Sequence, residues 1–127
     1  MATTATSHKT AAESFLKLVA SGDVRRAYDT YVGKGFRHHN AYFPADAVSL
    51  MKGMEDDARK NPQKQIEIKQ TIEEADRVAV FSHVRHNPGE RGAALVHIFR
   101  FENDRIVELW DLGQEIPENS PNEIGMF

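Results

Sequence analysis

The chain has 127 residues, with 16 basic and 19 acidic side chains and a formal net charge of −3. That length suits one domain, residues 1–127, which buries about two-thirds of its unfolded surface. Nucleic-acid phosphates require a concentrated basic surface, so the negative net charge argues against a nucleic-acid partner. Apolar runs are only a few residues long, and we therefore expect no membrane partner either.

The sequence contains no cysteine, which excludes a disulfide framework and a thiolate nucleophile or ligand. Residues 1–6 lack the charge followed by an apolar core that a secretion signal requires. Both features fit a reducing compartment, and we predict a cytoplasmic protein.

Apolar residues at three- and four-residue intervals predict three helices in the first half of the chain. They cover residues 11–19 after a Ser7 cap, residues 24–31 after an Asp23 cap, and residues 45–60. A brief strand is expected at residues 36–40, between the second helix and the third. The broad apolar face of the third helix comprises Val48, Leu50, Met51, Met54 and Ala58.

After Pro62 the hydrophobic period changes to two, which is typical of strands with one buried face. Ile66, Ile68 and Ile72 alternate with polar residues, and further strands are predicted at residues 77–86, 92–101 and 105–112. Helices followed by strands predict an α+β fold, with three N-terminal helices on one face of a curved antiparallel sheet. We expect a cone-shaped α+β barrel that encloses a cavity.

The turn between the last two strands decides which side chains share a face. Residues 103–104 form either a two-residue turn or part of a three-residue loop, in which a bulge pairs Phe101 with Arg105. We favour the bulged register, because it sets Arg100 diagonal to Glu108, where the two side chains can form an ion pair.

In the bulged register, one face of the last two strands is apolar apart from an imidazole and a carboxylate. This face comprises Leu95, His97, Phe99, Val107, Leu109 and Asp111. If it is the concave face, His97 and Asp111 both project into an apolar pocket. The opposite face carries Trp110, Ile98 and Val96 and is too apolar for open solvent, so we predict a homodimer packed through the outer face of the sheet.

Asp111 is the first candidate for a catalytic residue, because an apolar cavity disfavours a charged carboxylate and makes it a better proton acceptor. The alternative is an aspartate that is exposed at a strand end or paired with a base. His38 and His39 point to opposite faces of a short strand, so only one of them faces the pocket. His97 shares the predicted Asp111 face, whereas the sequence leaves the face of His83 open.

Several histidines and an acid near one cavity also permit a metal site. No helical His-x-x-x-His spacing is present, however, and we predict no metal. The sequence also lacks a glycine-rich phosphate loop and a nucleophile-elbow pattern. We therefore expect the protein to use no cofactor.

Five short segments together resemble one family: residues 23–28 (DVRRAY), 36–40 (FRHHN), 97–101 (HIFRF), 107–111 (VELWD) and 125–127 (GMF). The family is that of the SnoaL-like polyketide cyclases, in the superfamily named for nuclear transport factor two. Within it, the chain is similar to the branch of predicted SnoaL-like aldol-condensation-catalysing enzymes. The resemblance spans nearly the whole chain and implies a cone of three helices against a curved sheet, usually as a dimer.

The resemblance also implies roles for individual residues. Asp111 matches a pocket aspartate that serves the family's cyclases as acid and base without a cofactor. His39 and Asn40 match a histidine–asparagine pair at the pocket. His97 departs from the family pattern, since many relatives carry an acid there, and Ile124 stands where an asparagine is usual.

We therefore predict a cofactor-independent acid/base enzyme, an aldol-type cyclase, lyase or isomerase, that acts on a small carbonyl compound in an apolar pocket. Asp111 would move the proton α to the carbonyl, and His39 or His97 would stabilise the enolate oxygen with help from Asn40. The other predicted pocket residues are His83, Leu109, Phe99, Met51 and Met54. The alternative is a noncatalytic dimeric module of the same fold that binds a hydrophobic small molecule.

Overall fold

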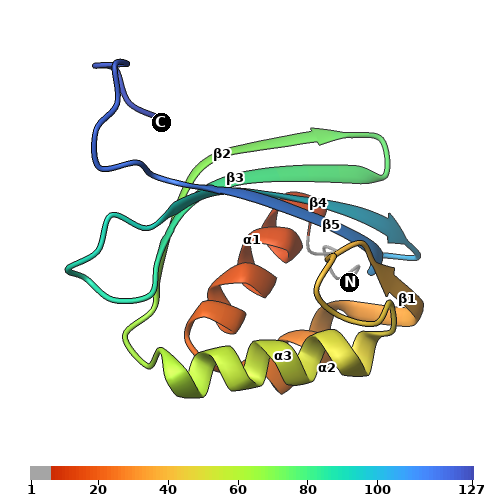
Figure 1. The fold of residues 1–127 in the computed structure, drawn as a ribbon. Coiled ribbons are helices and arrows are strands. Elements are labelled where there is room, and N and C mark those ends of the chain that lie inside the picture. The colour runs from red at the N-terminus through yellow and green to blue at the C-terminus, as the bar shows by residue number, and fades with distance from the viewer. Residues whose placement is uncertain (1–6) are drawn as a thin grey trace.

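The structure, a computed structural model, describes residues 7–127 and contains three helices and five strands in these residues (Figure 1). The elements in chain order are α1 (His8–Ala20), α2 (Val24–Tyr31), β1 (Val32–His38), α3 (Ala47–Lys60), β2 (Gln65–Glu74), β3 (Arg77–Arg85), β4 (Ala93–Glu102) and β5 (Arg105–Glu115). The N-terminal segment in which we predict no secretion signal lies outside the described residues. Among the described residues, no helix is both long and apolar enough to cross a membrane.

The helices begin close to where the sequence predicts. Ser7 caps α1, since its side chain accepts a hydrogen bond from the backbone N–H of Thr10 at 3.1 Å. Asp46 caps α3 in the same way through the backbone N–H of Ser49. Asp23 precedes α2 as predicted, but its side chain makes no capping hydrogen bond. The predicted apolar face of α3 is wrong at Val48, which is 52% exposed.

The sheet has the strand order β1-β5-β4-β3-β2 and is open at both edges. The four later strands pair antiparallel as predicted, but β1 pairs with β5 in parallel, so the sheet is mixed rather than purely antiparallel and does not close into a barrel. Strand β1 begins at Val32, earlier than the predicted residue 36, because Gly33 lets the chain pass close to β5. A Cβ atom at Gly33 would lie 2.8 Å from the Cβ of Arg105.

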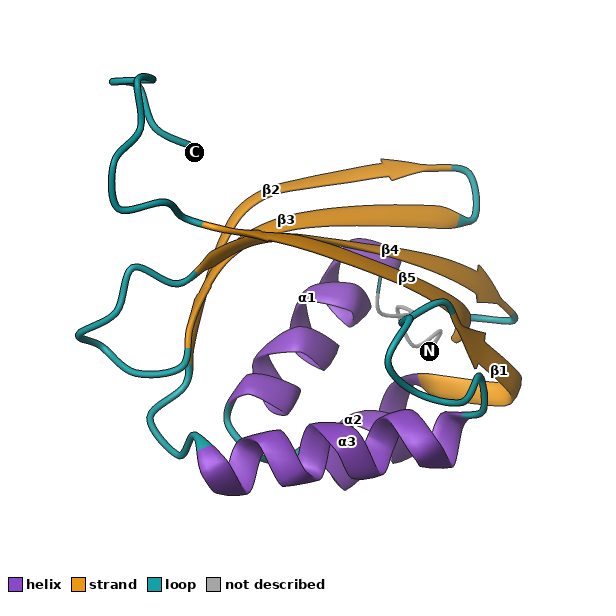
Figure 2. Cartoon of the chain, viewed as in Figure 1, coloured by secondary structure: helices purple, strands orange, loops and turns teal. Residues whose placement is uncertain are grey.

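The helices all lie on the concave side of this curved sheet, and the convex side is free of helices (Figure 2). The core between the two layers is built around aromatic and aliphatic side chains with no solvent exposure, among them Phe15, Phe99, Ile106 and Leu109. On β2, Ile66 and Ile68 pack against this core, whereas Ile72 is 61% exposed. The register shift between Ile68 and Gln70 ends the predicted alternation.

The turn between β4 and β5 differs from the prediction. Asn103 and Asp104, with φ values of 50° and 62°, form a two-residue turn that pairs Glu102 with Arg105. A bulge follows within the hairpin, so Ile106 takes the core position predicted for Val107. From Glu108 onward the side chains face the sides we predict, because the unpaired Val107 changes the alternation by one residue, as the predicted bulge would have done.

The observed register, which is shifted by two residues from the predicted one, has two consequences. His97 pairs directly with Asp111, so both side chains leave the same face of the sheet. Arg100 pairs directly with Glu108 on the opposite face, and its Nε lies 2.9 Å from the Glu108 Oε1. The predicted ion pair is therefore confirmed, although the turn from which we derived it is wrong.

Candidate functional site

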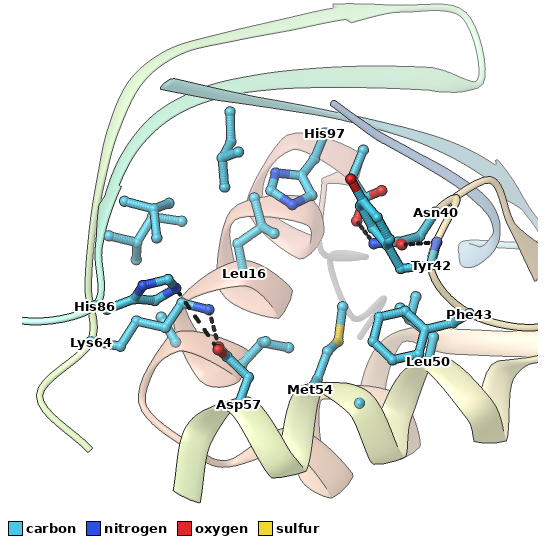
Figure 3. Close-up of a pocket in the computed structure, with 17 residues that line it drawn as sticks. Leu16, Asn40, Tyr42, Phe43, Leu50, Met54, Asp57, Lys64, His86 and His97 are labelled. Carbon is cyan, nitrogen blue, oxygen red and sulfur yellow. Dashed lines mark hydrogen bonds and ion pairs between the residues drawn. The ribbon is translucent and has the colours of Figure 1, made fainter. Parts of the chain in front are cut away.

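A cavity of about 540 Å³ lies between the helices and the concave face of the sheet (Figure 3). Most of its lining is hydrocarbon: Leu16, Val19, Ala20, Phe43, Leu50, Met54, Ile66, Val84 and Leu95. Polar side chains gather at two places. In Figure 3, Asn40 and Tyr42 lie at one end and Lys64, Asp57 and His86 at the other, with Leu16 and Met54 between them.

Asp111 lines the cavity at the Asn40 end and is half-buried within β5. Its Oδ2 accepts a hydrogen bond from the Asn40 Nδ2 at 3.1 Å, while the Asn40 Oδ1 accepts one from the backbone N–H of Tyr42. Burial raises the pKa of the Tyr28 phenol, and the negative charge of Asp111 raises it further. The carboxylate is therefore fixed in orientation and faces the cavity between helices and sheet.

His97, opposite Asp111 on β4, is 8% exposed and also lines the cavity. Within the described residues its Nδ1 is buried and has no hydrogen-bond partner. Burial lowers the pKa of His97 to about 4, the negative charge of Asp111 opposes that shift, and the positive charge of Lys64 adds to it. The imidazole is thus neutral at physiological pH and keeps hydrogen-bonding capacity that the surrounding side chains do not use.

A second hollow, of about 510 Å³, adjoins the same groups. It shares Asn40, Tyr42, Leu95, His97 and Asp111 with the first cavity. Tyr42, in the loop between β1 and α3, is 89% exposed and lines both spaces. Asp111 and His97 therefore border both hollows.

Of the two adjacent histidines, His38 points inward and His39 outward. His38 is 4% exposed, and both its ring nitrogens are engaged, by the Pro44 carbonyl at 2.6 Å and by the backbone N–H of Asn40 at 3.0 Å. It therefore shapes the loop that carries Asn40. The His39 Nε2 lies 2.7 Å from the Glu108 Oε2 on the convex side of the sheet. His39 does not line the first cavity, but it lines the second hollow together with Asp111.

The remaining predicted pocket residues divide between the cavity and other places. Met54 lines the cavity, and the Tyr28 hydroxyl lies 3.3 Å from its sulfur. Phe99 and Leu109 are completely buried in the core, where they support the cavity without lining it, and Met51 packs against the same core. His83 stacks on Phe127 at 4.6 Å and bonds the Arg91 carbonyl, away from the cavity lining.

The polar group at the far end of the cavity comes from three segments. Asp57 lies in the last turns of α3, Lys64 just before β2, and His86 just after β3. The Lys64 ammonium donates to the Asp57 Oδ2, and the His86 Nε2 lies 3.9 Å from the Asp57 Oδ1. Burial tends to raise the pKa of Asp57, but the hydrogen bond and charge of Lys64, together with the charge of His86 and a hydrogen bond from Asn61, outweigh it and lower the pKa, so Asp57 is ionised at neutral pH.

Residues 7–127 contain no cluster of three or more His, Asp or Glu side chains close enough to hold a metal ion. The two carboxylates that line the cavity have other partners. Asp111 is bonded to an amide, and Asp57 to an ammonium. At the Asn40 end, Asp111 and His97 present a carboxylate and a neutral imidazole in largely apolar surroundings.

Comparison with known proteins assigns the chain to a family. A family described as "SnoaL-like domain" matches residues 12–109, which is more than half of the chain. The protein belongs to the SnoaL-like family. No curated protein sequence matches it.

Solved structures share the fold of this SnoaL-like chain. AclR from Streptomyces galilaeus, a proposed hydroxylase, has a TM-score of 0.72 and 22% identity, over 85% of this chain and 79% of its own. A proposed polyketide cyclase from Bacillus cereus has a TM-score of 0.71 and 19% identity, over 84% and 74% of the two chains. A proposed isomerase of the SnoaL-like family from Agrobacterium tumefaciens has a TM-score of 0.71 and 12% identity, over 84% and 97%. At these identities the matches establish the fold.

Sequence reasoning missed the far end of the cavity in this SnoaL-like protein. A signal for Asp57 was present, because Leu50, Met54 and Asp57 follow one another at intervals of four and three residues on one face of α3. No spacing relates Lys64 or His86 to that face, since they come from two separate loops. Only the tertiary structure brings the three side chains together.

Proposed function

We propose that this SnoaL-like protein is a cofactor-independent acid/base enzyme that moves a proton α to the carbonyl of a small, largely apolar compound. The observation that carries the proposal is the pairing of Asp111 with His97 across β4 and β5, at one end of an apolar cavity. A base and a neutral hydrogen-bonding group beside one hollow are the two components that enolisation needs.

Asp111 acts as the base in the proposed step. Its carboxylate takes the proton from the α carbon, and the electron pair of the broken C–H bond moves toward the carbonyl oxygen, which gives an enolate. Asn40 bonds Oδ2, so Oδ1 is the oxygen that remains for the substrate. Return of the proton to a different carbon gives an isomerase, and attack of the enolate carbon on a second carbonyl gives an aldol-type cyclase.

His97 stabilises the enolate oxygen in this scheme. A neutral imidazole carries one N–H, and because its pKa lies at about 4 it donates a hydrogen bond without protonating the product at neutral pH. The apolar lining strengthens that hydrogen bond relative to water. General acid–base groups of this kind contribute about 10²- to 10⁴-fold in rate.

Deuterium exchange tests the proposal without knowledge of the natural substrate. Small ketones and β-keto compounds are incubated with the protein in D₂O, and incorporation at the α carbon is followed by NMR. We expect incorporation with the wild type and a loss of about 10²-fold or more in Asp111→Asn, which keeps the size of the side chain. Asp76→Asn, the same substitution in the exposed turn between β2 and β3, is the matched control and should exchange at the wild-type rate. Equal exchange by Asp111→Asn and wild type would remove Asp111 from the mechanism.

The second candidate function is noncatalytic binding of a hydrophobic small molecule, which the apolar middle of the cavity favours. Asp111 and His97 then select a ligand rather than transform it. This candidate predicts saturable ligand binding by the wild type and no exchange above the uncatalysed rate for any compound of the panel.

We further propose that a second copy of the chain covers the convex face of the sheet. Trp110, Ile98 and Val96 lie there as neighbours across β4 and β5, and Leu112, 73% exposed, extends the patch. Side chains of both signs flank it, as in the Arg100–Glu108 pair, and a two-fold interface needs such self-complementary charge. Analytical ultracentrifugation should find a dimer that Leu112→Glu dissociates, whereas a monomeric wild type would contradict the proposal.

A further inference from the structure

The far end of the cavity, opposite Asp111, holds a lysine with unused hydrogen-bond donors. The Lys64 side chain is 19% exposed and lines the cavity beside Ile66 and Val84. An ammonium has three N–H donors, and Asp57 accepts one of them. The remaining donors are available to a ligand in the cavity.

Asp57 holds the Lys64 ammonium in place, but its own oxygens are already used as hydrogen-bond acceptors. Its Oδ2 accepts from Lys64, and its Oδ1 accepts from the Asn61 Nδ2 at 2.9 Å and faces the His86 Nε2 at 3.9 Å. Both carboxylate oxygens are therefore engaged. A ligand at this end meets donors rather than acceptors, and it must bring an oxygen that accepts.

Charge selects which kind of oxygen fits. Lys64 brings one positive charge, while Asp57 and Glu90 bring two negative ones, and the Glu90 Oε1 lies 3.6 Å from the His86 Nδ1. The charges of Lys64 and Asp57 balance each other, so this end of the cavity has no unpaired positive charge. An anionic group would lose its hydration there without a net attraction, whereas a neutral hydroxyl or carbonyl oxygen accepts from the ammonium without that cost.

We propose that Lys64 is a specificity residue that binds a neutral oxygen, a hydroxyl or a carbonyl, at the end of the substrate remote from the reacting carbon. The substrate class is thus a compound with an apolar middle and oxygen at both ends. The inference rests on the proposed function in one respect only, namely that the reaction takes place at the Asp111 end of the cavity.

Unreactive aromatic rings of two lengths test this inference. The affinities of 2,6-dihydroxynaphthalene and 2-naphthol are compared by calorimetry, as are those of 4,4′-dihydroxybiphenyl and 4-hydroxybiphenyl. A second oxygen that accepts from a charged donor should strengthen binding about tenfold in at least one of the two pairs. Lys64→Met, which keeps the aliphatic stem, should lose that advantage. Lys69→Met on the outer face is the matched control and should keep it.

Two further comparisons test the role of charge. The acid 6-hydroxy-2-naphthoate should bind the wild type more weakly than the diol. Asp57→Asn removes a negative charge and should shift the affinity ratio toward the acid, a change that a merely structural role for Asp57 would not produce. No diol advantage in either ring pair, an advantage kept in Lys64→Met, or an acid that outcompetes the diol would each overturn the inference.

Failure of the Lys64 inference can be distinguished from failure of the proposed reaction. A diol advantage measured in Asp111→Asn, which lacks the proposed base, involves no turnover and supports the role of Lys64 alone. Exchange that depends on Asp111, together with no diol advantage, would retain the proposed reaction and reject the distal oxygen site.

Discussion

The buried imidazole of His97 makes the stability of the folded protein depend on pH. Its ordinary pKa of 6.5 applies to the unfolded chain, and burial lowers the pKa to about 4 in the folded protein. Between pH 4 and pH 6.5, His97 is protonated in the unfolded chain and neutral in the folded protein. The contribution of His97 is therefore fully present above pH 6.5 and is lost progressively as the pH falls toward 4.

The magnitude follows from the gap between the two pKa values. A gap of about 2.5 pH units, at about 1.4 kcal/mol per unit, gives a loss of roughly 3 kcal/mol. This is a large part of the 5–15 kcal/mol by which folded domains are typically stable. Urea unfolding at pH steps from 7 to 4 measures it, with His97→Gln as the comparison, because the variant keeps all the carboxylates and loses only the imidazole.

We expect the free energy of unfolding of the wild type to fall about 1.4 kcal/mol per pH unit more steeply than that of His97→Gln in this range. Titration of the His97 ring protons by NMR provides a second measurement, which stays informative if the variant folds poorly. Parallel stability curves for the two proteins, or an NMR midpoint near 6.5, would refute the reasoning.

Three further predictions concern the fold and the site. Gly92→Ala should destabilise the protein by at least about 1 kcal/mol more than Gly35→Ala in urea unfolding. Both glycines have positive φ, but only at Gly92 would the new Cβ meet backbone, 2.2 Å from the Val84 carbonyl oxygen; equal losses would contradict this reading. Phe99→Ala should cost about 3–5 kcal/mol, because the ring is completely buried, and a loss below about 1 kcal/mol would mean that the core closes around the gap. Asn40→Ala should slow α-proton exchange without a comparable loss of stability, since it frees the carboxylate that Asn40 orients, and an unchanged exchange rate would show that this hydrogen bond is dispensable.

The sequence predicted most of the fold because its signals are local. Helical spacing, the Ser7 cap and the switch to a period of two after Pro62 each act within a few residues. The parallel pairing of β1 with β5 joins residues about seventy positions apart, and no local pattern encodes it. The prediction for the β4–β5 turn was wrong because the bulge lies at Val107, inside the hairpin, rather than in the turn at Asp104. The predicted faces are nevertheless right, since one extra residue at either place changes the alternation in the same way.

The candidate site was predictable in part for the same reason. Asp111 and His97 are neighbours in one hairpin, so strand alternation alone could place them on one face. Alternation also showed that only one of His38 and His39 faces inward, but which one depends on the distant partner strand. Lys64 lies in the loop before β2, and it lines the cavity beside His86 from the loop after β3. Only the folded chain brings these two loops together.

The position of a bound enol mimic tests the central claim most directly. The hydroxyl of 2-naphthol resembles the enol that the proposed reaction forms, and a crystal structure of its complex would locate it. We predict that this oxygen lies within hydrogen-bond distance of both Asp111 and His97, with the rings between Leu16 and Met54. A naphthol bound in the cavity with its oxygen away from both groups, or bound only outside the cavity, would contradict the account.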